Sequence, residues 1–288
     1  MVNEYILRAK KFHTKKRLGQ NFLISKDVIN EILSFANSDD TVLEIGPGAG
    51  FVTEKLVEKV KKAVAVELDE DAVNLLDKNL SGFQNFKLIK NDILKTDLKE
   101  LFADEIKENK KIKVIANIPY YITTPILLYL LGEMDDRDYE YRNMIDEIIL
   151  MVQYEVAKRI TANHSSKNKE YGLLSILSNF WAETSLVKKV SKRCFYPSPK
   201  VDSALVRFKI QNNPRTEITP YLKQTVRAAF SMRRKNIKNC LKASGFINVE
   251  EALSSTGIDY NLRGENLSIE DFYKLSLILK REEQCKLK

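Results

Sequence analysis

The segment Asn-Ile-Pro-Tyr-Tyr at residues 117–121 carries side chains that could perform chemistry on an aromatic amine. The exocyclic amine of adenine is a poor nucleophile, because its lone pair is delocalised into the ring. The side-chain oxygen of Asn117 and a neighbouring backbone carbonyl can each accept one N–H of such an amine, which favours a more pyramidal nitrogen. Tyr120 offers a flat face on which an extruded base can stack, and Pro119 fixes the turn between them. These three residues are candidate catalytic residues, with an ordinary strand-end turn as the alternative.

A glycine-rich turn, Leu-Glu-Ile-Gly-Pro-Gly-Ala-Gly, occupies residues 43–50. Its glycines at 46, 48 and 50 let the backbone turn sharply and approach a ligand without a Cβ in the way. The spacing G-x-G-x-G differs from the G-x-G-x-x-G that cradles a dinucleotide pyrophosphate. Glu44 precedes the first glycine, and a carboxylate there suits a cationic ligand better than a diphosphate. The turn therefore favours a cofactor other than a dinucleotide.

Two further acids end the strands that follow this turn. Glu67 stands 21 residues after Gly46, where a carboxylate can bind both hydroxyls of a ribose. Asp92 ends the next strand and could accept a hydrogen bond from an adenine amino group. A glycine turn with acids at successive strand ends suits a nucleoside that carries a sulfonium, namely S-adenosylmethionine. The alternatives are a purely structural turn beside ordinary acids and, less favoured by the glycine spacing, an NAD-type cofactor.

The elements that must position these residues alternate along the chain from about Asp40. The expected strands cover residues 41–46, 63–69, 86–92 and 111–118, and the expected helices cover residues 51–60 and 71–80. Strands that alternate with helices pair in parallel through right-handed crossovers, so we expect an α/β fold with an open, doubly wound, Rossmann-like sheet. Ligands bind at the carboxyl edge of such a sheet, which is where the candidate residues gather.

The domain organisation is indicated by a polar, proline-containing stretch at residues 211–220. Before it, residues 186–210 are rich in β-forming residues. After it, the sequence shows helical periodicity without a clear strand. We therefore predict a catalytic domain over residues 1–211 and a small helical domain over residues 212–288.

The excess positive charge lies at the two ends of the chain. The protein has 47 Lys and Arg residues against 39 Asp and Glu residues, for a net charge of +8. Residues 1–20 hold six basic residues against one acidic residue, and residues 212–288 hold fourteen against nine, so the part between them is slightly acidic. Two basic ends on a nearly neutral body point to a polyanionic partner. Ordinary solubility charge is an equal alternative on this evidence alone.

The composition is that of an ordinary globular protein, with 44% hydrophobic and 30% charged residues. No stretch approaches the ~18–20 uncharged apolar residues of a membrane span, and the first residues lack the apolar core of a secretory signal. Three widely spaced cysteines, Cys194, Cys240 and Cys285, favour a reducing compartment. The two histidines, His13 and His164, belong to no cluster with metal-ligand spacing. We expect a cytoplasmic protein without a metal site.

The motifs together resemble one family, the bacterial-type small-subunit ribosomal RNA adenine N6,N6-dimethyltransferases. The matching segments are RLGQNFL (17–23), LEIGPGAG (43–50), VELD (66–69), ANIPYYITTP (116–125), FYPSPKVDS (195–203), AAFSMRRK (228–235) and RGENLS (263–268). The resemblance runs from about Lys16 to Leu277 in the family's motif order. It implies a class I methyltransferase that uses S-adenosylmethionine to dimethylate N6 of two adjacent adenines, in a hairpin loop near the 3′ end of small-subunit (16S) rRNA, during ribosome assembly.

Site residues follow from the resemblance position by position. The implied cofactor contacts, to which the glycine turn adds Gly48, are Asn21, Leu23, Gly46, Glu67, Asp92 and Asn117. The implied base site is Asn117, Pro119 and Tyr120, with Phe195 stacking on the other face of the target base. From the residues alone, Phe195 is an aromatic side chain before a Pro-x-Pro turn and would more often belong to the core.

The basic ends then become candidate contacts to RNA phosphates. The predicted residues are Lys15, Lys16 and Arg17 near the N-terminus, and Arg233, Arg234, Lys235 and Lys238 in the helical RNA-binding domain. Phosphate contacts of this kind give affinity and salt dependence without reading sequence. If residues 233–238 are helical, Arg233, Arg234 and Lys238 are close neighbours. The alternative for any one of them is an ordinary solvated helix face.

Two other functions stay open on the sequence alone. The related adenine methyltransferase that modifies large-subunit rRNA and confers macrolide resistance shares several motifs, but the G-P-G turn, PYYITTP, RRK and RGENLS favour the small-subunit enzyme. The same fold can also serve as a non-catalytic rRNA-binding assembly factor, against which the intact Asn117, Pro119 and Tyr120 argue. The expected partner is small-subunit rRNA or a precursor of the 30S-type subunit, without membrane or metal, and we expect a monomer.

Overall fold

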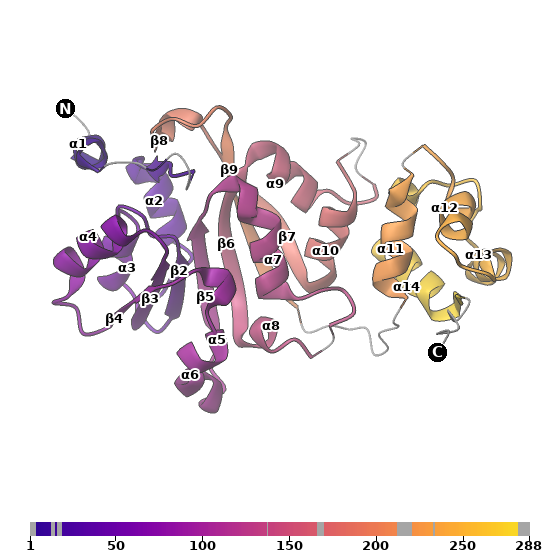
Figure 1. Cartoon of the computed structure of the whole chain (residues 1–288), viewed down its shortest axis with the longest axis horizontal. Coiled ribbons are helices and arrows are strands. Elements are labelled where there is room, and N and C mark those ends of the chain that lie inside the picture. The colour runs from indigo at the N-terminus through magenta and orange to yellow at the C-terminus, as the bar shows by residue number, and fades with distance from the viewer. Residues whose placement is uncertain are drawn as a thin grey trace, which may run out of the picture. The chain divides into compact units, whose positions relative to one another are not determined.

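The computed structural model of the chain describes residues 4–12, 15, 19–136, 138–165, 170–211, 221–232 and 234–281. The chain packs into two compact units (Figure 1). The sheet unit contains Met1–Gly132, Asp138–Ala157 and Ala182–Ile210, and the helical unit contains Glu133–Arg137, Lys158–Trp181 and Gln211–Lys288. The last segment of the helical unit begins at the predicted boundary. Its two earlier segments lie within the part that the sequence assigns to the first domain.

The sheet unit is built on seven strands in the order β4-β3-β2-β5-β6-β9-β7. Their bounds are β2 Thr41–Ile45, β3 Lys62–Glu67, β4 Phe86–Lys90, β5 Ile112–Asn117, β6 Ile145–Gln153, β7 Ala182–Val190 and β9 Ser203–Ile210. The strands from β4 to β6 pair in parallel, which confirms the four predicted strands and the Rossmann-like sheet. The sheet is not parallel throughout, because β9 runs antiparallel to both β6 and β7.

The helices of this unit alternate with its strands along the chain. Their bounds are α1 Glu4–Lys11, α2 Lys26–Leu33, α3 Thr53–Val57, α4 Glu70–Leu80, α5 Leu98–Leu101, α6 Ala103–Lys107, α7 Thr123–Leu131 and α8 Glu140–Met144, and α9 (Tyr154–Thr161) crosses into the helical unit. The predicted helix over 51–60 is shorter, and the predicted helix over 71–80 is confirmed as α4. Val42, Ile115 and Ile149 from neighbouring strands share one core with Ile29 and Leu56 from helices.

Helix α4 shows how the sequence sets an element beside the glycine turn. Asp69 is its N-cap residue, and the side chain accepts a hydrogen bond from Asp71 N, which satisfies a backbone donor that would otherwise lack a partner. Ala72, Leu76 and Leu80 recur every four residues and are buried. The helix therefore begins where β3 has just ended, and its first turn lies next to the end of that strand.

The helical unit has no long strand among its described residues, as the sequence predicts. Its helices are α10 Leu173–Trp181, α11 Leu222–Ser231, α12 Ile237–Ala243, α13 Val249–Thr256 and α14 Ile269–Ile278. Helix α13 ends at Gly257, which adopts a left-handed conformation with φ of 69°. One expectation is wrong here. Residues 234–236 lie in the turn between α11 and α12, so Arg234 does not share a helix with Lys238.

Candidate active site

An open pocket lies at the carboxyl edge of the sheet, where β2, β3 and β5 end. Its volume is about 1060 Å³, including the space open to solvent. Nine of the predicted site residues line it: Asn21, Leu23, Gly46, Gly48, Glu67, Asp92, Asn117, Pro119 and Tyr120. The structure therefore brings together residues from five separate stretches of the sequence. Four of these stretches follow parallel strands, whose carboxyl ends lie at one edge, and the fifth is the N-terminal segment with Asn21 and Leu23.

The glycine turn follows β2 and passes close to Phe22, a residue of the N-terminal segment that lines the same pocket. Gly48 has a φ of 56°, and a Cβ at this position would lie 2.8 Å from the Cε1 of Phe22. Any other residue would therefore meet both a strained backbone conformation and an aromatic ring. The backbone N–H of Gly48 donates to Glu67 Oε2 at 3.0 Å, so the turn also holds the acid at the end of β3.

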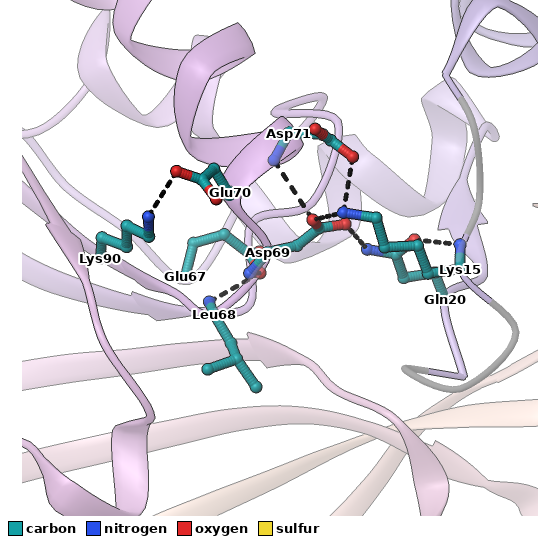
Figure 2. Close-up of polar contacts among 8 residues, drawn as sticks. All are labelled: Lys15, Gln20, Glu67, Leu68, Asp69, Glu70, Asp71 and Lys90. Atoms are coloured by element: carbon teal, nitrogen blue, oxygen red, sulfur yellow. Dashed lines mark hydrogen bonds and ion pairs between the residues drawn. The ribbon is translucent and has the colours of Figure 1, made fainter.

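Glu67 is buried and already accepts three backbone hydrogen bonds. Besides Gly48, Leu68 N and Asp69 N each donate to Oε1 at 2.8 Å (Figure 2). Burial raises the pKa of Glu67, while these bonds favour its ionised form. A carboxylate has about four acceptor positions, so a ribose with two hydroxyls would have to share an oxygen or replace one amide. The side chain is thus held in one orientation before any ligand binds.

Glu44 is a second buried acid in the pocket wall, and it is only 6% exposed. Its Oε2 is buried without a hydrogen-bond partner among the described residues, and so is the hydroxyl of Thr53. Burial raises the pKa of Glu44 to about 8. The nearby Thr53 hydroxyl opposes this rise, and the nearby Glu67 adds to it. A buried carboxylate oxygen without a partner is costly unless a ligand supplies one. The unpartnered oxygen of Glu44 therefore fits a ligand with a cationic end.

Asp92 lies two residues after the end of β4. Its Oδ1 caps a short helical turn, Ile93–Lys95, by accepting from Leu94 N at 3.0 Å. The side chain is half-buried and lines the pocket. One carboxylate oxygen is thus used for the local turn, and the other is the atom that could accept from a ligand amino group.

Asn117 ends β5, and its amide group has a defined orientation. Its Nδ2 donates to the backbone carbonyl of Asn21 at 3.4 Å, which leaves Oδ1 as the atom that can accept from a substrate amine. The next carbonyl along the chain, that of Ile118, has no backbone hydrogen-bond partner in the described part of the chain. The carbonyl of Pro119, by contrast, already accepts from Ile122 N at 3.2 Å. Asn117 Oδ1 and the Ile118 carbonyl are therefore the two candidate acceptors.

Tyr120 is held by its hydroxyl rather than left to rotate. The hydroxyl lies 2.7 Å from Ser203 Oγ at the start of β9, and burial raises the pKa of Tyr120, so it stays neutral. Tyr121 also lines the pocket and is 66% exposed. The pocket thus has an aromatic wall whose first ring is fixed by a hydrogen bond and whose second ring faces solvent.

Phe195 is the predicted site residue that the structure does not bring to the pocket. It lies in β8 (Phe195–Tyr196), which pairs with β1 (Phe22–Leu23) so that Phe195 stands opposite Leu23. The ring is 3% exposed and belongs to the hydrophobic core. Strand pairing sets Phe195 beside Leu23 in this core, and its buried ring leaves no exposed face for a base.

The predicted RNA contacts differ in whether they already form ion pairs within the protein. Lys15 is ion-paired with Asp69 and Asp71 (Figure 2). Lys238 lies 3.1 Å from Glu250, whereas Arg234 and Lys235 are exposed. Three predicted contacts, Lys16, Arg17 and Arg233, lie outside the described residues, as do His13 and Cys285.

The sequence-based predictions left out Gln20 and Tyr121, which line the pocket, and Asp69, which accepts a hydrogen bond from Gln20. Gln20 is next to Asn21 in the same motif and was available as a signal, whereas Asp69 reads as an ordinary N-cap residue. Within the described ranges, no cluster of His, Cys, Asp and Glu could hold a metal ion. None of the helices described is both long and apolar enough to cross a bilayer.

Comparison with known sequences identifies the family of the chain. The sequence profile of the ribosomal RNA adenine dimethylase family matches residues 11–281. A ribosomal RNA small subunit methyltransferase A from Clostridium botulinum (strain ATCC 19397 / Type A) is 41% identical over 283 residues, which cover 96% of each chain. The protein of the same name from Clostridium acetobutylicum is 39% identical and covers 94% of this chain and 95% of its own.

Comparison with solved structures gives the same result. A dimethyladenosine transferase from Plasmodium falciparum has a TM-score of 0.73 at 25% identity and covers 88% of this chain and 95% of its own. The 23S rRNA methyltransferase ErmE has a TM-score of 0.66 at 26% identity, with coverages of 89% and 98%. The fold is that of a class I methyltransferase, and the chain belongs to the ribosomal RNA adenine dimethylase family.

Proposed function

We propose that this protein transfers methyl groups from S-adenosylmethionine to N6 of two adjacent adenines, in a hairpin loop near the 3′ end of small-subunit rRNA, during ribosome assembly. The observation that carries the proposal is a single pocket that combines buried acids on one side with Asn117 and a fixed aromatic ring on the other. Membership of the family and the names of the relatives that cover nearly the whole chain support the substrate.

The cofactor side of the pocket would hold S-adenosylmethionine through residues of this chain. Glu67 would bind the ribose, Asp92 the adenine amino group, and Gly46 and Gly48 would let the cofactor approach the backbone. The unpartnered oxygen of Glu44 supports the fit, because it needs a cationic or hydrogen-bonding partner. When bound, S-adenosylmethionine supplies a methyl group that is electrophilic because it is attached to a sulfonium.

The base side would hold the amine in line with that methyl group. Asn117 Oδ1 and the Ile118 carbonyl would each accept one N–H of the target amine, while the Tyr120 ring stacks on the base. Alignment of the two reacting atoms supplies much of the acceleration. Held in this way, the amine nitrogen would take the methyl group as its bond to sulfur breaks, with the bonding electrons remaining on sulfur. The resulting ammonium is acidic enough to release its proton to water, so no strong general base is required.

The same acceptors explain how a second methyl group can be added. After the first transfer the amine keeps one N–H, which Asn117 or the Ile118 carbonyl can still accept. Rotation of the monomethylated amine would place its methyl group where the other N–H had been.

Affinity for RNA would come from the basic residues at both ends of the chain. Arg234 and Lys235 are exposed in the turn before α12, and together with Lys16, Arg17 and Arg233 they are the proposed phosphate contacts. Lys238 remains a proposed contact, although it would have to exchange Glu250 for a phosphate. We assign residues 212–288 as the RNA-binding domain of a monomeric protein that acts in the cytoplasm on ribosomal precursors.

A methyl-transfer assay with three substrates tests this function. Naked rRNA, free small subunits and large subunits are incubated with labelled S-adenosylmethionine, and the modified nucleosides are identified by mass spectrometry. We expect N6,N6-dimethyladenosine in small-subunit rRNA only. Label in large subunits would instead support the activity named for ErmE, and no label despite measurable cofactor binding would support a non-catalytic factor.

A further inference from the structure

The segment before β1 is tied to the start of α4 by a closed network of polar contacts (Figure 2). Lys15 Nζ pairs with the carboxylate of Asp69 and lies 2.5 Å from Asp71 Oδ2. Gln20 Nε2 donates to Asp69 Oδ2 at 2.6 Å, and its Oε1 accepts from Lys15 N at 2.8 Å. Two residues from the N-terminal segment therefore converge on one carboxylate.

Asp69 connects this network to the cofactor side of the pocket. Its own backbone N–H donates to Glu67 Oε1 at 2.8 Å, while its buried side chain holds Lys15 and Gln20. Gln20 and the next residue, Asn21, line the pocket. Asp69 thus contacts Glu67, the proposed ribose-binding carboxylate, through its backbone. Through its side chain it contacts one wall of the pocket.

The network does more than cap a helix. As the N-cap residue, Asp69 needs only to accept from Asp71 N, which it does at 3.2 Å. Although burial raises the pKa of Asp69, the bonds from Lys15 and Gln20 outweigh it, and the pKa is lowered. The carboxylate is therefore ionised at neutral pH and binds both partners at once. Capping alone explains neither the lysine nor the glutamine.

A neighbouring ion pair provides the contrast. Glu70, the next residue, pairs with Lys90 at 2.7 Å, and both side chains are about half exposed or more. Neither Glu70 nor Lys90 lines the pocket. An exposed ion pair of this kind contributes little to stability. The Glu70–Lys90 pair is therefore a control for a charge contact at the start of α4 that does not reach the pocket.

We propose that Asp69 is a positioning residue for the cofactor. Through Lys15 and Gln20 it holds the pocket wall at residues 19–21 in the conformation that binds the cofactor. Lys15 serves this contact rather than an RNA phosphate. The inference rests on the proposed function, since it takes S-adenosylmethionine as the ligand of this pocket. A wall that is already ordered loses less conformational freedom when the ligand binds, so the affinity rises.

Calorimetry with S-adenosylmethionine and with S-adenosylhomocysteine on the full chain tests the proposal. Asp69→Asn keeps the helix cap, because Asn caps as well as Asp, and Lys15→Gln changes a partly exposed side chain with little risk to folding. We expect each variant to raise Kd about tenfold, and the double variant to raise it no further, because both changes break one network. Lys15→Arg should remain near the wild-type value, and Glu70→Gln should leave Kd unchanged.

Activity measurements separate positioning from chemistry. At saturating S-adenosylmethionine, kcat of both variants should stay within about twofold of wild type, with the loss confined to KM for the cofactor. Unchanged Kd in both variants would overturn the proposal. So would a Lys15→Gln variant that loses salt dependence of rRNA binding while its cofactor Kd is unchanged, since Lys15 would then be a phosphate contact. Failure of the wild-type chain to bind either nucleoside would instead refute the proposed function.

Discussion

The two halves of the pocket are built from different kinds of residue. The cofactor half comprises Glu44, Gly46, Gly48, Glu67 and Asp92, and the base half comprises Asn117, Pro119, Tyr120 and Tyr121. In the cofactor half the acids are buried or half-buried, and Glu67 alone accepts three backbone hydrogen bonds. The base half carries no charged side chain. It is more exposed, and its side chains are held by few contacts.

The difference follows from what each half has to do. A cationic cofactor can be recognised by fixed acids that it neutralises, so charge belongs in the cofactor half. A neutral amine needs acceptors for its N–H groups rather than a counter-charge, and the neutral oxygens of Asn117 and Ile118 can supply them. The contrast predicts that substitutions in the cofactor half change binding, whereas substitutions in the base half change turnover.

The largest expected effect is in the base half, for Asn117→Ala. Loss of the Oδ1 acceptor should lower the single-turnover rate by about 10²–10³-fold, the usual cost of removing one positioned polar group. The Kd for S-adenosylmethionine should change much less. Asn79→Ala, an exposed position on α4, is the matched control. A rate near wild type for Asn117→Ala would show that the Asn117 side chain does not act in methyl transfer.

Glu67→Gln is the corresponding change in the cofactor half. The amide can accept at one oxygen only, so at least one backbone N–H loses its acceptor and the charge-assisted bonds are lost. We expect Kd for S-adenosylmethionine to rise about 10- to 100-fold, in line with hydrogen bonds to charged groups. The rate at saturating cofactor should fall much less. Thermal melts of the variant separate this effect from partial unfolding.

Glu44 predicts a pH dependence of cofactor binding. Burial raises the pKa of Glu44 from an ordinary 4.5 to about 8 in the free protein. A cationic ligand favours the ionised form, so affinity should increase as pH rises toward 8, and binding should release a proton below it. Calorimetry in buffers of different ionisation enthalpy measures that proton. Glu44→Gln should abolish the part of the proton release that comes from this residue.

The same raised pKa has a defined effect on stability. Between pH 4.5 and about 8 the folded protein keeps a proton on Glu44 that the unfolded chain has released. The free energy of unfolding should therefore fall as pH rises through this window, as far as this group contributes. In denaturant titrations over the same pH range, the free energy of unfolding of Glu44→Gln should depend less on pH than that of wild type.

The smallest expected effect is for Tyr120→Phe. The ring face that stacks on the base is kept, and only the bond to Ser203 is lost. A neutral hydrogen bond contributes about 0.5–1.5 kcal/mol, so we expect a rate loss of about two- to tenfold without change in cofactor Kd. Ser203→Ala should have a similar effect, and the two together should not add. Independent, additive losses would show that the hydroxyl has another role.

Much of the site could be predicted from the sequence because parallel strands end at one edge. Glu67, Asp92 and Asn117 follow β-forming runs, so their convergence was implied by strand order alone. The contacts that sequence analysis missed depend on segments far apart in the chain. Pairing of β8 with β1 buries Phe195, and the carboxylate of Asp69 engages Lys15. Neither partner leaves a periodic signal in the sequence.

The central claim is that the two halves divide binding and chemistry between them. The most direct measurement is a single-turnover time course on small ribosomal subunits, taken for wild type, Glu67→Gln and Asn117→Ala at rising concentrations of S-adenosylmethionine. We expect Glu67→Gln to approach the wild-type rate at saturation, while Asn117→Ala stays slow at every concentration. Recovery of Asn117→Ala at high cofactor, or equal losses in both variants at saturation, would contradict it.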